Sequence, residues 1–337
     1  MKVQKFEVTE VKLEIKDPSI FDDTSLIPGD AYQKCEIEIH GINAGFTAAL
    51  RACMIDEIPV RGMTIEGNYM EHISGREDEI DTYVLPEVLL KSIQAVRINQ
   101  TIDIPKDVTA HLDVTNNSMD PIYITTNHLV LTTSKKEVIK GVIPPNIPLC
   151  VLGPRKHLKV SKIVIVTGKA HFDRATADAN LFSGLPIFGY RQLDGLDKSC
   201  LVYEAKDYAI SFKTYYGDSA IRLVKLACKE IVSRLETLIE NIEWLSKKSK
   251  EDVNNYLSVI ANTEAKKYTF LLETRSLILG VCYYIKGLGI ISAHDVNNET
   301  QSHSILSVFH PDADAVVIKA CKNMIADFKT LLEYHKK

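Results

Sequence analysis

The sequence predicts an α+β protein in which two related modules of one chain pack together as an intramolecular pseudo-dimer. Three observations lead to this prediction. Short segments with an apolar residue at every second position are typical of half-buried strands. Longer segments with apolar residues at spacings of three and four predict amphipathic helices. Two of these long segments have similar sequences, which indicates an internal repeat.

The repeat is clearest in two segments of the second half of the chain. Residues 227–240 read ACKEIVSRLETLIE, and residues 320–333 read ACKNMIADFKTLLE. Two unrelated amphipathic helices would explain this likeness equally well, but the upstream segments ALRACMI and ILGVCYY also place Leu and Cys alike. The repeat therefore predicts helices that pack on each other through one apolar stripe each. The residues expected in this pseudo-dimer contact are Leu50, Ile231, Leu235, Leu238, Met324, Phe328 and Leu331.

The first module is expected in two pieces, residues 1–60 and 190–248. KVQKFEVTEVKLEIKD and CEIEIHGI alternate as strands do. FTAALRACMIDEI predicts a helix that ends before Pro59, because the residue before a proline disfavours helical backbone. After residue 190 an alternating stretch, LVYEAKDYAISFKTYYG, precedes a long helix whose buried stripe is expected to run from Ile221 to Leu245.

A β-rich domain, residues 61–189, is expected as an insertion in the first module. It contains many short strand-like runs and one helical segment, LPEVLLKSIQAV. Residues 249–337 are expected to form a polar linker followed by the second module. This module again runs strand, short helix, strand and long helix, and Asp312 or Asp314 is expected to cap the last helix.

The composition restricts the class of protein. With 337 residues, 45% hydrophobic and 25% charged, the chain is typical of a globular protein of two or three domains. A net charge of −4 and a pI near 6.2 argue against a protein that binds nucleic acid by itself. The N-terminal segment lacks the apolar stretch of a signal peptide, and no apolar run is long enough to span a bilayer. We therefore expect an intracellular protein that contacts no membrane.

The sequence contains no recognisable catalytic or metal-binding motif. Phosphate-binding glycine loops, zinc-protease motifs and nucleophile elbows are absent from it. The seven cysteines are an odd number and none stand at zinc-ligand spacing, which is typical of free thiols in a reducing compartment. We therefore expect no active site, no metal and no cofactor in this chain.

A basic stretch lies near the end of the expected insertion. PRKHLKVSKIVIVTGK carries Arg155, Lys156, Lys159, Lys162 and Lys169. It could face a protein partner or nucleic acid, but a solvated strand edge kept soluble by lysine is the interpretation we favour.

The segment ALRACMIDEIPVRGMTIE resembles the helix and proline turn of the alpha-type assembly subunits of multisubunit DNA-dependent RNA polymerases. That family typically has an Asn-x-Leu-Arg-Arg run, an acidic residue, a hydrophobic residue and then Pro. Leu50, Arg51 and Pro59 match this pattern, whereas Ala48 and Ala52 stand at the positions of the Asn and the second Arg.

Further segments resemble this family in its own order along the chain. LPEVLLKSIQAVRI, YITTNHLVL, IPLCVLGPRKHLKV and IVTGKAHFDRA are similar to successive parts of the larger alpha-like subunit, and Gly168, Lys169 and His171 match its Gly-Lys-x-His loop. LETRSLILGVCYYI and HPDADAVVIKACKNMIADF resemble the smaller partner, although Val281 replaces an Asn of its motif. The resemblance implies a larger and a smaller alpha-like partner fused in one chain, as in large nucleocytoplasmic DNA viruses.

This resemblance implies a non-catalytic platform that holds the two large catalytic subunits of a DNA-directed RNA polymerase, together with small assembly subunits. Such a chain would touch nucleic acid only through the complex and would form no homodimer. The implied locations are the host cytoplasm, at viral factories, and the virion. The family's larger subunit often carries a cysteine zinc loop, which this sequence lacks. The implied docking residues are Arg51, Asp56, Glu57 and Pro59, with Lys169 and His171 as a second contact.

Two other classes of protein remain open from the sequence. An unrelated scaffold or virion structural protein would also lack catalytic motifs, but its native complex would contain no stoichiometric polymerase subunits. A small-molecule enzyme on an α+β fold would bind a ligand tightly, or turn it over, as an isolated chain.

Overall fold

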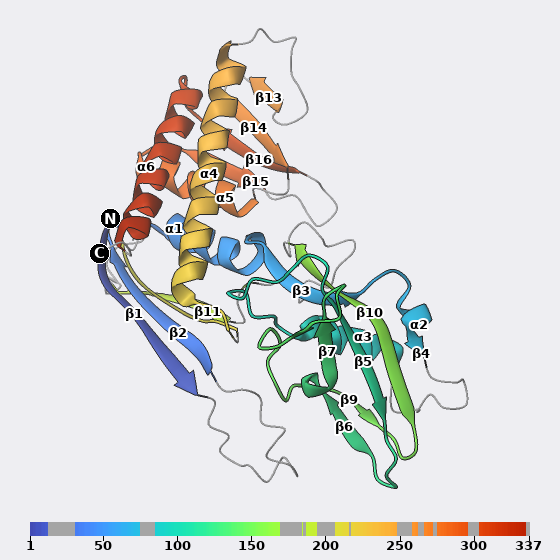
Figure 1. Cartoon of the computed structure of the whole chain (residues 1–337). Coiled ribbons are helices and arrows are strands. Elements are labelled where there is room, and N and C mark those ends of the chain that lie inside the picture. Colours follow the sequence, from blue (N-terminus) through green and yellow to red (C-terminus); the bar gives the residue numbers. More distant parts are fainter. Residues whose placement is uncertain are drawn as a thin grey trace.

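The structure, a computed structural model, describes residues 1–12, 31–74, 85–168, 184, 187–193, 206–215, 217–247, 258–261, 266–271, 275–295 and 303–334. These residues form a mixed α+β protein, as the sequence predicts, with antiparallel sheets and both long and short helices. Figure 1 shows one part that contains the long helices and a second part that is mostly β. No helix in the described ranges is both long and apolar enough to cross a bilayer.

The first sheet combines strands from distant parts of the chain. Its order is β1 (Lys2–Lys12), β2 (Ala31–His40), β12 (Asp207–Lys213) and β11 (Ile187–Gln192). On β2, Cys35, Ile37 and Ile39 are fully buried, and Glu36 and Glu38 alternate with them on the other face. Because successive side chains of a strand point to opposite faces, this sheet has one face in the core and one outer, charged face.

Helices cover the buried face of this sheet (Figure 1). They are α1 (Ala44–Ala52), which continues into a π-helical turn, η3 (Cys53–Glu57), and the long α4 (Ala220–Lys247). The sequence predicted that Ile221 begins the buried stripe of α4, but Ile221 is 37% exposed. Ala220 and Leu223 begin the stripe instead, whereas the expected residues from Val224 to Ile242 are buried as predicted.

The second sheet repeats this arrangement. Its order is β13 (Ser258–Ala261), β14 (Lys266–Leu271), β16 (His303–Val308) and β15 (Ser292–Asp295), with α5 (Arg275–Gly287) and α6 (Ala313–Tyr334) as its helices. Both sets run strand, strand, helix, strand, strand, helix along the chain, and in both the last two strands exchange places in the sheet. Asp312 caps α6, as the sequence predicts: its Oδ1 accepts a hydrogen bond from the Ala315 N–H at 3.4 Å.

The long helices α4 and α6 lie side by side (Figure 1) and bury matching positions. Each of the nine residues that α6 buries stands 93 positions after a buried residue of α4, as Cys321 does after Cys228. The similar letters of the two helices therefore correspond to a similar buried face. The matching pairs are Ala220 and Ala313, Leu223 and Val316, Val224 and Val317, Ala227 and Ala320, Cys228 and Cys321, Ile231 and Met324, Val232 and Ile325, Leu235 and Phe328, and Leu238 and Leu331.

The short helices α1 and α5 approach each other closely at two glycines. A Cβ atom on Gly45 would lie 2.7 Å from the Cβ of Tyr283 and 2.8 Å from the carbonyl oxygen of Gly280. A Cβ atom on Gly280 would lie 3.3 Å from the carbonyl oxygen of Gly45 and 3.4 Å from the Cβ of Ala49. The missing side chains therefore allow the two helix backbones to touch.

The alignment of α1 with α5 differs from the one that the sequence suggests. ALRACMI and ILGVCYY align Leu50 with Leu279, but Leu50 is fully buried and Leu279 is 37% exposed. The burial pattern instead aligns Leu50 with Val281 and Ala49 with Gly280, a shift of two residues. The expected alignment is wrong because a few matching letters in a short helix do not determine which of its sides faces the core.

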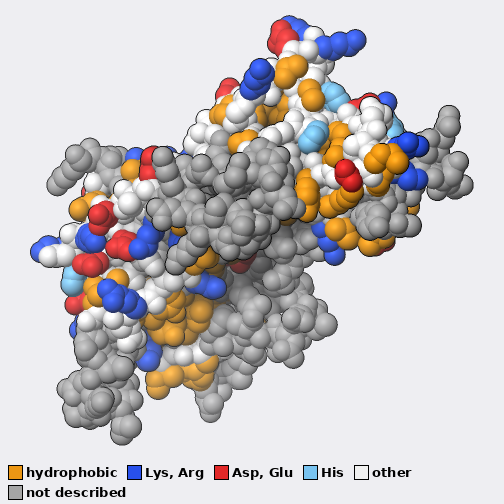
Figure 2. Space-filling view, turned by 90° about the horizontal axis from the view of Figure 1, so that it is seen from below, with side chains coloured by type: hydrophobic (Ala, Val, Ile, Leu, Met, Phe, Trp, Pro, Cys, Tyr) orange, Lys and Arg blue, Asp and Glu red, His pale blue; other side chains and the backbone are white. Residues whose placement is uncertain are grey.

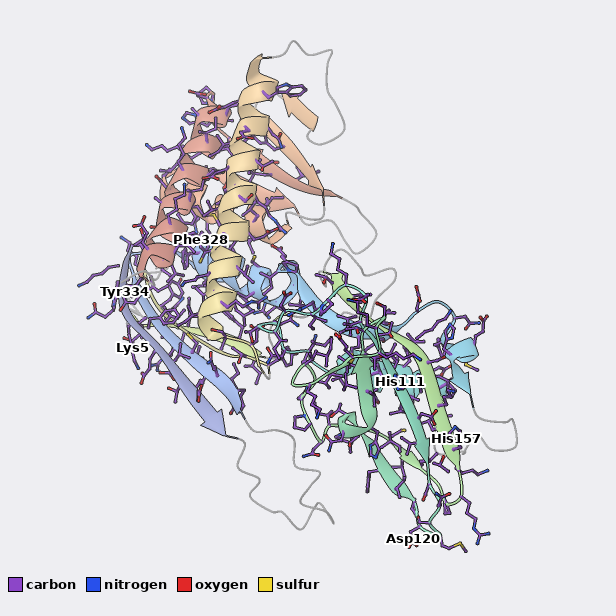
Figure 3. The ribbon with its side chains drawn as sticks, viewed as in Figure 1. Lys5, His111, Asp120, His157, Phe328 and Tyr334 are labelled. Carbon is purple, nitrogen blue, oxygen red and sulfur yellow. The ribbon has the colours of Figure 1, made fainter. Side chains whose placement is uncertain are left out.

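A single apolar core joins elements of both sheets. The ring of Phe46 in α1 stacks on that of Phe328 in α6, with centroids 4.2 Å apart and planes at 15°. At the last residue of α6, less than two turns further on, the ring of Tyr334 lies 6.4 Å from that of Phe6 on β1. Figure 3 shows Phe328 among the helices and Tyr334 beside the first sheet. A helix from the end of the chain thus completes the core above the first sheet.

The mostly β part, residues 60–168, has a core of its own that extends from Met63 to Ile163. Its main sheet has the order β3-β10-β5-β7-β8, with β4 paired to β10, and β6 pairs with β9. Helix α3 (Pro86–Ala95) is the one helical segment that the sequence predicted. The other elements are β3 (Val60–Ile65), α2 (Tyr69–His72), β4 (Ile73–Ser74), β5 (Thr109–Thr115), β6 (Ile122–Thr125), η4 (Thr126–His128), β7 (Leu129–Thr132), β8 (Val138–Ile139), β9 (Pro148–Leu152) and β10 (His157–Gly168).

Polar contacts fix this part against the strand and turn that precede α4. The guanidinium of Arg97 lies 4.3 Å from the ring centroid of Tyr215. A Cβ atom on Gly217 would lie 2.6 Å from the side chain of Asn99, and the φ of Gly217 is +66°. Arg61 donates to the carbonyl oxygen of Asn99 at 3.1 Å. The loop that contains Asn99 therefore contacts Arg61 through its backbone and Gly217 through a side chain. The contacts of Arg97 with Tyr215 and of Asn99 with Gly217 join the mostly β part to the segment before α4.

Substitution of Gly45 tests the contact between α1 and α5. In an exposed helix, Gly→Ala stabilises a protein by about 1 kcal/mol. Here Gly45→Ala should destabilise the protein by about 1–3 kcal/mol, because the added methyl group meets the backbone of α5. Gly280→Ala should cost less, since its nearest obstacle is the flexible end of Met324. Urea unfolding followed by circular dichroism measures both values, and equal effects of the two variants would contradict the close approach at Gly45.

Candidate docking site

The docking segment implied by the sequence is the turn at which α1 ends. Asn43 begins α1 by accepting a hydrogen bond from the Phe46 N–H at 3.2 Å. The helix then widens into η3, whose last turn closes where the Ile58 N–H donates to the Cys53 carbonyl at 3.0 Å. Ile58 has an extended backbone, as a residue before proline prefers, and Pro59 ends the helical run. Turns of π-helix are frequent at functional sites.

Glu57, one of the implied docking residues, is buried in an ion pair. It is 4% exposed, and its Oε2 accepts a hydrogen bond from Nη1 of Arg234 at 2.8 Å. The same guanidinium donates to Oε1 of Glu230 from Nε at 3.0 Å and from Nη2 at 2.8 Å. Arg234 therefore joins η3 to α4 through two carboxylates, and Glu57 holds the docking segment from inside the protein.

Arg51 and Pro59 are exposed, and Asp56 is half-buried. Arg51 forms no ion pair with another residue that the structure describes. An exposed guanidinium offers several donors in a rigid planar fork that matches a carboxylate. Arg51 and Pro59 therefore lie on the surface of the segment that Glu57 anchors.

Lys169 and His171, the implied second contact, lie outside the described residues. The strand that precedes them can be placed. β10 ends at Gly168, which pairs with Val60, the residue that follows Pro59. Pro59 therefore directly precedes β3, and Lys169 directly follows β10, the strand that pairs with β3.

The cysteines of this region are buried thiols. Cys53 is fully buried, with its Sγ 3.7 Å from the carbonyl oxygen of Ala227, and burial raises its pKa. Burial also raises the pKa of Cys228 and of Cys321. A thiol that stays protonated is a poor nucleophile and a poor metal ligand. In the parts of the chain that are described, no group of three His, Cys, Asp or Glu residues is arranged to hold a metal ion.

Comparison of the sequence with known protein-family models and with curated proteins gives no match to this chain. The geometry of the segment is therefore the basis on which a function is argued below.

Sequence reasoning missed the partner of Glu57. The residue Arg234 is visible in the sequence on the polar face of a helix, four residues after Glu230, which is the spacing of a surface ion pair. Glu57 stands 177 residues before Arg234, so only the folded chain brings the two side chains together.

Loss of the buried ion pair should weaken the whole fold. Arg234→Met should lower the free energy of unfolding by about 3 kcal/mol, because it leaves the Glu57 carboxylate buried without its partner. Arg51→Met, the matched control on the surface, should change it by less than about 0.5 kcal/mol. Adding Glu57→Gln to Arg234→Met should restore part of the loss. Urea unfolding curves measure all three, and an Arg234→Met variant as stable as the control would refute the anchoring role.

Proposed function

We propose that this chain is the assembly platform of a DNA-directed RNA polymerase and that its two modules form an intramolecular pseudo-dimer. The observation that carries the proposal is the repeated arrangement: two sheets with the same strand order and two long helices with nine matching buried positions. The series of motifs that resemble the larger and the smaller alpha-like subunits follows the same division of the chain. Together they support two related partners fused in one chain.

Contacts between the repeated elements support a pseudo-twofold relation. Helix α1 packs on α5, and α4 packs on α6, so that each helix meets its counterpart. Ala49 and Gly280, which the burial pattern aligns, approach each other where α1 crosses α5. In a twofold pair, equivalent surfaces meet in this way. The proposed modules are residues 1–60 with 190–248, and residues 249–337, with residues 61–189 inserted in the first.

The platform's role is to hold the two large catalytic subunits, along with small assembly subunits, and to leave catalysis to them. The exposed guanidinium of Arg51, with Asp56 and Pro59 beside it, is the proposed contact for one large subunit, and Lys169 with His171 the second contact. The chain reaches nucleic acid only through the complex. It forms no homodimer, because its own second module already covers the helices that a second copy would need. Its proposed sites of action are the host cytoplasm and the virion.

Isolation of the complex tests the proposal directly. The tagged chain, purified from its native setting at moderate salt, should bring with it two very large proteins at one copy each. The eluate should synthesise RNA without a promoter. A monomer alone, or a complex without polymerase subunits, would favour an unrelated scaffold or virion structural protein.

Charge reversal at Arg51 tests the docking contact. Arg51→Glu should reduce capture of one large subunit by about tenfold or more, because a guanidinium–carboxylate pair becomes a repulsive one. The variant should unfold at the same urea concentration as the wild type, since Arg51 is exposed. Lys91→Glu, an equal charge change on the exposed side of α3, is the control and should capture both subunits normally. Unchanged capture by Arg51→Glu would exclude this contact.

Division of the chain tests the pseudo-dimer. A break between Lys250 and Glu251 separates the proposed modules in the sequence. Co-expressed halves should form a one-to-one complex that dissociates on dilution, whereas the intact chain should not, because the covalent link supplies a high effective concentration. Each half alone should aggregate, since its helices lose the partner that buries them. A half that is folded and monomeric by itself would contradict the proposal.

A further inference from the structure

The outer face of the first sheet contains a hollow of about 290 Å³ across β2, β12 and β11. The strand register arranges its outward side chains in two rows. Glu38, Ala209 and Arg191 form one row. Glu36, Ser211 and Gly189 form the other. The hollow therefore has a floor of small side chains between carboxylates on β2 and a guanidinium on the edge strand β11.

Gly189 leaves space that its described neighbours do not require. A Cβ atom at this position would have ordinary contacts, 3.7 Å from the Oγ and 3.9 Å from the carbonyl oxygen of Ser211. A glycine within a strand costs stability, and it often marks a place where another chain comes close. Packing among the described residues therefore does not explain the glycine, whereas the approach of an external group would.

The charges around the hollow are unevenly paired. Glu36 forms ion pairs with Lys34 at 2.6 Å and with Lys5 at 3.4 Å. Glu38 and Arg191, at opposite ends of their row, form no ion pair with any residue in the described ranges. Seen from below, acidic and basic side chains lie close together on one side of the molecule (Figure 2), and Figure 3 labels Lys5 beside β1.

We propose that this hollow is a docking site for an exposed loop of a second protein, which offers a lysine or arginine to Glu38 and an aspartate or glutamate to Arg191. Charge complementarity at the two ends and the room above Gly189 carry the inference. A second copy of this chain would place one hollow against another and leave both unfilled. The inference goes beyond the proposed function, since it does not require the partner to be a polymerase subunit.

Photo-crosslinking tests the site in the full-length chain. Ile187 lies on the same face of β11, two residues from Gly189, and is 56% exposed. Replacing Ile187 with p-benzoylphenylalanine places a photoreactive group at the rim and leaves the hollow empty. After irradiation of the tagged chain in its native setting, mass spectrometry should identify one peptide of one other protein, with a basic and an acidic residue close together.

Filling the hollow should remove this crosslink. Gly189→Val should lower its yield by about tenfold, because added methyl groups occupy the space of the loop. The same variant should be at least as stable as the parent, since valine favours strands. Thr9→Val, on the outer face of β1 and away from the hollow, is the matched control and should leave the yield unchanged.

Each result separates this inference from the polymerase proposal. A charged loop that belongs to a protein other than a polymerase subunit would support the docking site and leave the proposed function to the co-purification experiment. Co-purified polymerase subunits with no crosslink at Ile187 would overturn the docking site alone. A crosslink to this chain itself, or one that Gly189→Val leaves unchanged, would also overturn it.

Discussion

The apolar layer between the helices of the two halves is the constraint on which the rest of the structure depends. Phe46 of α1 stacks on Phe328 of α6, so the helices that accompany the two sheets share one apolar layer. Hydrophobic stabilisation is proportional to the apolar area removed from water, so the residues of this layer stabilise the contact between the two sets of helices. Residues of both sheets belong to this one core, whereas the mostly β part has a separate core.

The repeated helices use the same position for different polar contacts. Arg234 of α4 and Asp327 of α6 stand 93 residues apart, the spacing of the buried pairs. Arg234 binds Glu57 of η3, whereas Asp327 accepts a hydrogen bond from the hydroxyl of Tyr284 in α5 at 2.7 Å. Each contact ties a long helix to the short helix of its own half. Burial, and the Asp327 carboxylate as its hydrogen-bond partner, raise the pKa of Tyr284, so its hydroxyl remains a donor at neutral pH.

The spacing of apolar residues predicted most helices and strands of this fold. It predicted less well which side of a short helix is buried. The similar letters of α4 and α6 correspond to matching buried faces because those helices are long enough for the period to be distinct. The same reasoning failed for Leu50 and Leu279, where a few letters allow several alignments. The burial of Glu57 was also not predicted. A carboxylate at the end of a helix is usually exposed, and the residue that buries it here, Arg234, is distant in the sequence. The hollow at Gly189 depends on three strands and has no signal in any one of them.

Differences between the halves matter more for the proposed function than their likeness. A twofold body offers identical surfaces, and identical surfaces cannot choose between two different large subunits. Among the described residues, the mostly β part comes between β2 and β11 of the first sheet along the chain, and its Arg97 contacts Tyr215, which follows β12. Within the described ranges, the buried pair of Glu57 and Arg234 anchors the proline turn of the first half, and Arg51 stays exposed. Repetition thus provides a stable common core, and the departures from repetition give each side of the proposed platform its own partner.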